Sequence, residues 1–63
     1  MKRTEFEKMH DITEIKRNLF VSLFKDNKIK NHYFITLDYN FIRRFYAETE
    51  TKAIEKYNEF LKE

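Results

Sequence analysis

Two groups of basic residues in the middle of the chain could bind phosphate or acidic side chains. Lys25, Lys28 and Lys30 lie within one short polar stretch, and Arg43 and Arg44 are adjacent. Lysine ammonium groups neutralise phosphates, and a guanidinium makes bidentate contacts with anions and stacks on aromatic rings. A solvated loop for the lysines and a structural ion pair for one arginine are the alternative interpretations.

Aromatic residues are interleaved with these basic groups. Tyr33 and Phe34 follow the lysines, and Tyr46 follows the arginines. Such a pattern suits nucleic acid, because bases stack on rings while basic side chains hold phosphates. The candidate contacts with a partner or with nucleic acid are Lys25, Lys28, Lys30, Tyr33, Phe34, Arg43, Arg44 and Tyr46.

The chain lacks the residues that most catalytic sites need. It contains no glycine, proline or cysteine, which excludes glycine-rich phosphate loops, nucleophile elbows and thiolate metal sites. Its one serine, Ser22, lies in an apolar run without a sequence link to His10 or His32. His10, Asp11 and Glu14 would make a weak divalent-metal site at best. We therefore predict a protein that is not an enzyme and that holds no cofactor or metal.

Length and charge predict one small domain with an uneven electrostatic surface. The 63 residues have a net charge of +2 and are expected to form a single domain over residues 1–63. From Lys16 to Tyr46 there are seven basic and two acidic residues, whereas from Ala47 onward three basic residues face five acidic ones. Such asymmetry bears on partners more than on fold.

Composition also bears on origin and location. More than half of the residues are Lys, Asn, Ile, Phe, Tyr or Met, types whose codons are AT-rich, which favours a low-GC bacterium, its phage or a mobile element as the source. No apolar run approaches the ~18 residues of a membrane span. We therefore expect no membrane contact and a cytoplasmic protein.

The spacing of apolar residues predicts how these groups are positioned. Thr4-Glu5-Phe6-Glu7 has the pattern of a capping box, and apolar residues at every third position predict a helix from about Thr4 to Arg17. The run Leu19–Phe24 suits a strand better than a continuation of that helix. His32–Leu37 and Phe41–Tyr46 are predicted strands, and Thr49 is expected to cap a last helix that ends near Lys62.

Without glycine, other residues must adopt the positive φ angles that tight turns require. Asn tolerates this conformation better than most residues. We therefore expect Asn18, Asn27 and Asn40 to occupy the three breaks.

The predicted fold class is α+β, a helix–strand–strand–strand–helix order with a three-stranded antiparallel meander. The alternative is a helix–hairpin–helix with a longer first helix. The favoured order is similar to that of the double-stranded-RNA-binding domain, and Lys52 and Ala53 match its Lys-Lys-x-Ala-Lys motif. Residues 31–61 resemble the arm-type DNA-binding domain of tyrosine recombinases, in which Thr-x-x-Glu-Ala opens the helix. Thr49 and Ala53 match that motif, but Lys52 replaces its Glu.

A sheet of these strands would have two apolar faces, because side chains alternate along a strand. One predicted set is Leu19, Val21, Leu23, Phe34, Phe41 and Phe45; the other is Phe20, Phe24, Tyr33, Ile35, Leu37, Ile42 and Tyr46. Either the helices cover opposite faces, or a partner buries one face. Arg43 and Arg44 should lie on opposite faces, the inner one paired with a carboxylate such as Glu14 or Glu55.

These observations predict a small non-enzymatic interaction protein that binds and inhibits or modulates a macromolecular partner. The partner would be a protein or a nucleoprotein, and a phage or mobile-element protein acting on host nucleic-acid machinery fits the composition. A homodimer is a further expectation, because a second copy could cover the second face. The alternative is direct binding of DNA or RNA through the basic hairpin loop and the strand arginines.

Overall fold

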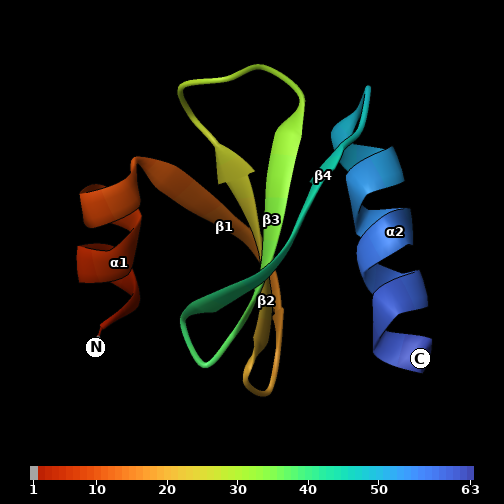
Figure 1. The fold of residues 1–63 in the computed structure, drawn as a ribbon, viewed down its shortest axis with the longest axis horizontal. Helices are drawn as coiled ribbons and strands as arrows, with labels where there is room; N and C mark the ends of the chain where they lie inside the picture. The colour runs from red at the N-terminus through yellow and green to blue at the C-terminus, as the bar shows by residue number, and fades with distance from the viewer. Residues whose placement is uncertain (1) are drawn as a thin grey trace.

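The computed structural model describes residues 2–63, which form two helices and a four-stranded sheet (Figure 1). The helices are α1 (Arg3–His10) and α2 (Glu50–Lys62), and the strands are β1 (Ile12–Asn18), β2 (Val21–Asp26), β3 (His32–Leu37) and β4 (Asn40–Tyr46). The strands form one antiparallel sheet in the order β1-β2-β3-β4. The predicted α+β class is confirmed, but the meander has four strands rather than three. Within residues 2–63, neither helix is long and apolar enough to cross a membrane.

The additional strand comes from the second half of the predicted helix over Thr4–Arg17, which is wrong. α1 ends at His10, and Asp11 adopts a left-handed conformation with a φ of 54° while its N–H donates to the carbonyl oxygen of Glu7. The sequence after this break is rich in β-branched residues, which favour an extended chain. Pairing with β2 along most of its length then stabilises the segment as a strand.

The predicted capping box is also wrong. Lys2 is the residue before α1, and it makes no side-chain hydrogen bond to the helix, whereas Thr4 lies inside the first turn. The carboxylate of Glu7 accepts a 2.7 Å hydrogen bond from the backbone N–H of Glu14. Glu7 therefore connects α1 to β1 instead of closing the start of its own helix.

The positive φ angles fall on different residues from the predicted Asn18, Asn27 and Asn40. They occur at Asp11, Leu19, Asn31, Asp38 and Tyr39. Asp38 and Tyr39 alone join β3 to β4, and a two-residue hairpin of the type I′ class needs positive φ at both positions. Asn40 supports this turn with its side chain, whose amide lies 3.3 Å from the carbonyl oxygens of Leu37 and Asp38.

The remaining strand predictions hold with small shifts. The strand interpretation of Leu19–Phe24 was right in kind, but β2 begins at Val21 because Leu19 and Phe20 form the turn after β1. The alternative of a longer first helix is therefore wrong. His32–Leu37 and Phe41–Tyr46 are confirmed as strands, the latter extended by one residue.

The two helices cover opposite faces of the sheet, as Figure 1 shows with α1 and α2 on either side of the strands. α2 packs on a core cluster made by Leu23, Tyr33, Ile35, Ala47, Ala53 and Tyr57, and α1 packs through Phe6 on Ile12 and Phe24. Leu23 pairs with Ile35, and Phe24 pairs with Phe34. The predicted grouping of Leu23 with Phe34 is therefore wrong, because the register across the loop from Asn27 to Asn31 is displaced by one residue from the expected one.

α2 has the predicted start and the predicted apolar face. The hydroxyl of Thr49 accepts a 3.2 Å hydrogen bond from the N–H of Lys52, which satisfies one of the free donors at the helix start. Ala53 and Tyr57 are buried, and Ile54, Phe60 and Leu61 pack at the margin of the same cluster.

Candidate functional site

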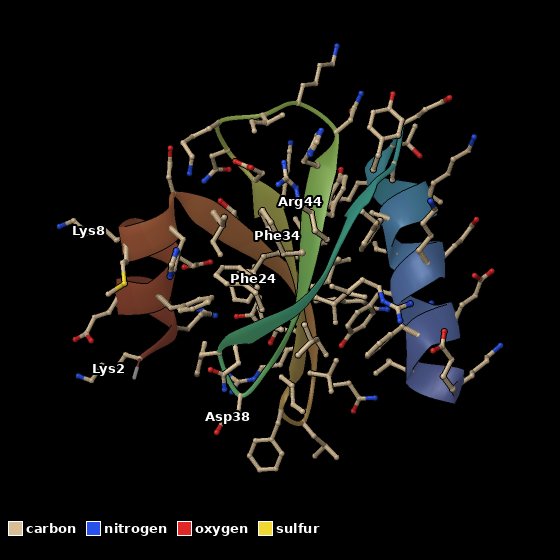
Figure 2. All side chains as sticks on the ribbon, viewed as in Figure 1. Lys2, Lys8, Phe24, Phe34, Asp38 and Arg44 are labelled. Carbon is tan, nitrogen blue, oxygen red and sulfur yellow. The ribbon has the colours of Figure 1, made fainter. Side chains whose placement is uncertain are left out.

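A row of directly paired residues crosses the α1 face of the sheet. Glu14 of β1 lies opposite Phe24 of β2, Phe24 opposite Phe34 of β3, and Phe34 opposite Arg44 of β4. Figure 2 shows Phe24, Phe34 and Arg44 in succession across the centre of the molecule. Phe24 is buried under α1, Phe34 is half-buried and Arg44 is exposed. Because α1 has only eight residues, it leaves the Arg44 end of this row uncovered.

A groove of about 260 Å³ lies at this uncovered end, between the C-terminal end of α1, the β2–β3 loop and β4. It combines cationic, aromatic and aliphatic side chains around one buried carboxylate. Its lining residues are His10, Ile12, Asp26, Lys28, Ile29, Phe34, Phe41 and Arg44.

The guanidinium of Arg44 lies beside rings and has no acidic partner among the described residues. Its central carbon is 5.9 Å from the centroid of the Phe34 ring, and its Nη2 is 3.4 Å from Nδ1 of His32. Because a guanidinium can only donate, Nδ1 of His32 acts as the acceptor in this contact. Within residues 2–63, the four ion pairs involve other basic side chains. The positive charge of Arg44 is thus available to a ligand.

Arg43 lies on the opposite face, as predicted, and its charge is already used. Its Nη1 is 3.7 Å from Oε2 of Glu63, and its guanidinium carbon is 4.9 Å from the centroid of the Phe60 ring. The hollow beside it is also lined by Glu59, whose carboxylate would repel phosphate. The carboxylate partner is therefore Glu63, which directly follows α2, rather than the predicted Glu14 or Glu55.

Asp26 fixes the backbone of the loop that carries Lys28. Its Oδ1 accepts hydrogen bonds from the N–H groups of Lys28, at 2.8 Å, and Ile29, at 3.3 Å. Burial alone would raise the pKa of Asp26, but these two bonds and the charge of Lys28 outweigh it, so that the pKa lies below its ordinary value. The ammonium of Lys28 donates a 2.7 Å hydrogen bond to the carbonyl oxygen of His10. Lys28 is thereby held at the groove entrance.

Aromatic rings form the floor of the groove. Phe41 meets Phe34 edge-on with 5.1 Å between ring centroids, and it meets His10 edge-on at 4.9 Å. Phe41 also packs on Phe6 at 5.2 Å, yet 44% of its surface is exposed. The floor therefore packs on α1 at its inner side and is open to solvent on its outer side.

The structure brings together only part of the predicted contact set. Lys28, Phe34 and Arg44 line the groove, and Lys30 follows in the same exposed loop. Tyr46 lies beside this region, because its ring meets the His32 ring edge-on with 6.2 Å between centroids.

Three predicted contacts lie elsewhere. Tyr33 is 3% exposed within the α2 core, and burial raises the pKa of its phenol. Lys25 pairs with Tyr33 and therefore lies on the α2 face, as does Arg43. These residues cannot share a ligand with Arg44.

Sequence reasoning missed six residues of this region: His10, Ile12, Asp26, Ile29, His32 and Phe41. The position of His32 could not have been found from the hairpin between β3 and β4 alone, because a two-residue turn after Leu37 would pair His32 with Phe45. The irregularity between Ile35 and Thr36 shifts the register, so that His32 lies opposite Tyr46. The contribution of His10 had no signal in the sequence, since it depends on the break in the chain at Asp11.

A second surface, which we call the apolar end, consists of Leu19, Phe20 and Leu37 at the tips of the two hairpins. The N–H of Asp38 donates a 2.8 Å hydrogen bond to the carbonyl oxygen of Phe20, which joins the two turns. Leu19 is 81% exposed, Phe20 64% and Leu37 46%. Leu19 also has a φ of 57°, a conformation that costs a residue with a Cβ roughly 1–2 kcal/mol.

Comparisons of this chain with protein-family models, with curated proteins and with solved structures find no match. The function must therefore be argued from its two distinctive surfaces. They lie at opposite ends of the sheet, as the positions of Arg44 and Asp38 in Figure 2 illustrate. The groove carries positive charge, whereas the three side chains of the apolar end are uncharged, with Asp38 and Arg17 beside them.

Proposed function

We propose that this protein binds nucleic acid through the groove and catalyses no reaction. One observation carries the proposal: the exposed guanidinium of Arg44 lies over the Phe34 ring without an acidic partner in residues 2–63. A guanidinium that packs on an aromatic ring can bind a phosphodiester of a nucleic acid, because the guanidinium contacts the phosphate while neighbouring rings contact the bases.

The charges around Arg44 support the same ligand. Lys28 and Lys30 add two positive charges on the adjoining loop, and Lys28 is fixed by its bond to the carbonyl of His10. Asp26 is the one carboxylate that lines the groove. Its charge is directed to two backbone N–H groups, so it opposes a bound phosphate less than a free carboxylate would.

The two adjacent arginines provide a matched test. Arg44→Ala should weaken binding of a labelled oligonucleotide about tenfold, because it removes a charged contact with phosphate. It should also reduce the slope of log affinity against log salt by about one. Arg43→Ala should leave both quantities unchanged, since Arg43 faces Glu63 on the other side of the sheet.

Fluorescence anisotropy at ~50 mM salt, where phosphate contacts are strong, measures these affinities. Circular dichroism establishes that both variants are folded. The proposal is wrong if neither DNA nor RNA is retained at that salt concentration. It is also wrong if the two arginine variants lose affinity equally.

A second candidate function is the binding and inhibition or modulation of a macromolecular partner, and the apolar end favours it. Leu19 is the most exposed of the large apolar residues and adopts a positive φ, so the fold tolerates strain in order to present an apolar side chain. Strained residues concentrate at functional positions. A phage or mobile-element protein directed at host nucleic-acid machinery would combine this surface with the groove.

The solution mass tests this second candidate first, because a homodimer through the apolar end would already explain its exposure. If the protein is a monomer, capture from a host lysate by the wild type should be lost with Leu19→Asn. Capture that is equal for the two proteins would rule out the apolar end as the contact surface.

A further inference from the structure

We infer that the groove takes single-stranded nucleic acid, with one unpaired base against Phe34 and Phe41 and the adjoining phosphates at Arg44 and Lys28. This inference rests on the proposed function and names its ligand more closely. It follows from the partial exposure of the rings, from their position between two cations, and from the charge of the surrounding elements.

The rings of the groove are placed for stacking with a base that is not paired. Phe41 is 44% exposed, and Phe34 is half-buried between Phe41 and Arg44. A base in a duplex has both faces covered by its neighbours, whereas a base in a single strand can place one face on an aromatic ring. Rings set in a groove therefore have more to gain from a single strand.

The cations lie on two sides of these rings. Arg44 approaches from β4, and Lys28 approaches from the β2–β3 loop, where its ammonium is anchored on the last residue of α1. A single strand of nucleic acid that crosses the groove would thus meet a positive charge on either side of the stacked base. Tyr46, exposed beside His32, offers a further ring to the next nucleotide.

Neither helix has the basic face that a duplex groove would require. Figure 2 shows Lys2 and Lys8 at α1 directed away from the sheet and from the groove, and Arg3 of α1 is already paired with Glu7 and Glu14. From Glu50 to Lys62, α2 has equal numbers of acidic and basic residues, three of each, and Glu48 and Glu63 flank it. A rigid duplex contacting either helix would meet carboxylates, whereas a flexible strand can follow the groove alone.

The test compares ligands with the same kind of phosphate backbone but different base exposure; the duplex carries twice the charge of a single strand of its length, so charge alone would favour the duplex. The probes are a labelled oligothymidylate and an oligouridylate of about 12 nucleotides, a duplex of the same length, and an abasic oligomer. We expect the single strands to bind at least tenfold more tightly than the duplex and the abasic oligomer. The single strand that binds more tightly, DNA or RNA, identifies the backbone of the natural ligand. Binding of either one supports the inference.

Two phenylalanine variants separate stacking from charge. Phe41→Leu keeps an apolar side chain in the floor but removes the ring, and it should weaken single-strand binding by about five- to a hundredfold. Phe20→Leu removes an exposed ring at the apolar end and should leave binding unchanged. If Phe41→Leu proves unfolded by circular dichroism, the comparison of normal and abasic oligomers carries the test by itself.

The outcomes distinguish this inference from the proposed function. A duplex bound as tightly as the single strand, or an abasic oligomer bound as tightly as the normal one, overturns the inference and leaves nucleic-acid binding standing. Loss of affinity with Arg44→Ala in that case still supports the groove as a phosphate site. No retention of any probe at ~50 mM salt overturns both.

Discussion

The hydroxyl of Tyr57 in α2 donates a 2.7 Å hydrogen bond to the carbonyl oxygen of Val21, the first residue of β2. Tyr57 is buried in the core cluster on this face. The bond therefore fixes α2 at the end of β2 that follows the turn of Leu19 and Phe20. The position of α2 on the sheet and the conformation of the apolar end are linked through this one contact.

Tyr57→Phe should lower the free energy of unfolding by about 1 kcal/mol, because the carbonyl of Val21 loses a hydrogen-bond donor in a part-buried place. Urea denaturation followed by circular dichroism measures the change. Tyr46→Phe is the control, since that ring is exposed and its loss of a hydroxyl should change stability little. A Tyr57→Phe protein as stable as the wild type would contradict the structural role of the bond.

The same phenol predicts how stability changes at high pH. Burial raises the pKa of Tyr57 above the ordinary value of 10.0, and the nearby carboxylate of Glu14 adds to this effect. A group whose pKa is raised on folding contributes stability that is present below its unfolded pKa and lost as the pH rises through its folded pKa. The wild type should lose stability above pH ~10, and Tyr57→Phe should lose less over that range. Tyr33, whose pKa is also raised by burial, accounts for the loss that remains.

Asp26 predicts the opposite dependence at low pH. Burial opposes its ionisation, but the hydrogen bonds from Lys28 and Ile29 dominate and the pKa is lowered below 3.8. A group with a lowered pKa contributes stability above its unfolded pKa and loses that contribution as the pH falls through its folded pKa. Stability should therefore decline below pH ~4, as measured by thermal unfolding across acid pH.

Asp26→Asn tests this interpretation by removing the charge and keeping an oxygen acceptor. It should cost about 1–2 kcal/mol at neutral pH and flatten the acid dependence. Asp38→Asn is the matched control, because Asp38 is an exposed turn residue with a φ of 50° that Asn also tolerates. If both variants keep the acid dependence of the wild type, another carboxylate is responsible.

The second half of the chain was predictable because local signals and tertiary contacts agree there. The hydroxyl of Thr49 caps α2, and the apolar spacing of α2 matches the face that it buries. The first half was not predictable in this way. Apolar residues from Phe6 to Ile15 keep a helical spacing, yet the chain breaks at Asp11 and continues as a strand. Pairing with β2, the next strand along the chain, decides between the two.

One feature of the site was predictable from the alternation of side chains along a single strand. Arg43 and Arg44 lie on opposite faces because they are neighbours in β4. The register between β2 and β3 decides which residues of these strands share the face of the groove. The loop between the two strands has its positive φ at Asn31 rather than at the predicted Asn27. Tyr33 was predicted as a contact because it follows the lysines in the sequence, and this register makes it a core residue.

Thr36 provides a prediction of increased stability. Its side chain is buried in β3, and its hydroxyl has no hydrogen-bond partner within residues 2–63. Thr36→Val replaces this hydroxyl with a methyl group of similar shape, so the free energy of unfolding should rise by about 1 kcal/mol. Thr36→Ser keeps the hydroxyl, removes a methyl group and should lower stability by about 1 kcal/mol. If chemical denaturation shows Thr36→Val to be the less stable of the two variants, the hydroxyl has a favourable role in the sheet.

Substitution of Leu19 distinguishes a role in stability from a role in binding at the apolar end. Because its side chain is 81% exposed and its φ is 57°, Leu19→Asn should lose little packing and relieve strain, which would raise the free energy of unfolding by about 0.5–1 kcal/mol. Leu37→Asn, an exposed strand residue of the same surface, should give no gain, since β-propensity disfavours Asn there. Thermal unfolding measures both variants. If Leu19→Asn is more stable than the wild type and no longer captures the partner, the strain at Leu19 is maintained for binding. If Leu19→Asn is less stable, Leu19 is a packing residue of the hairpin.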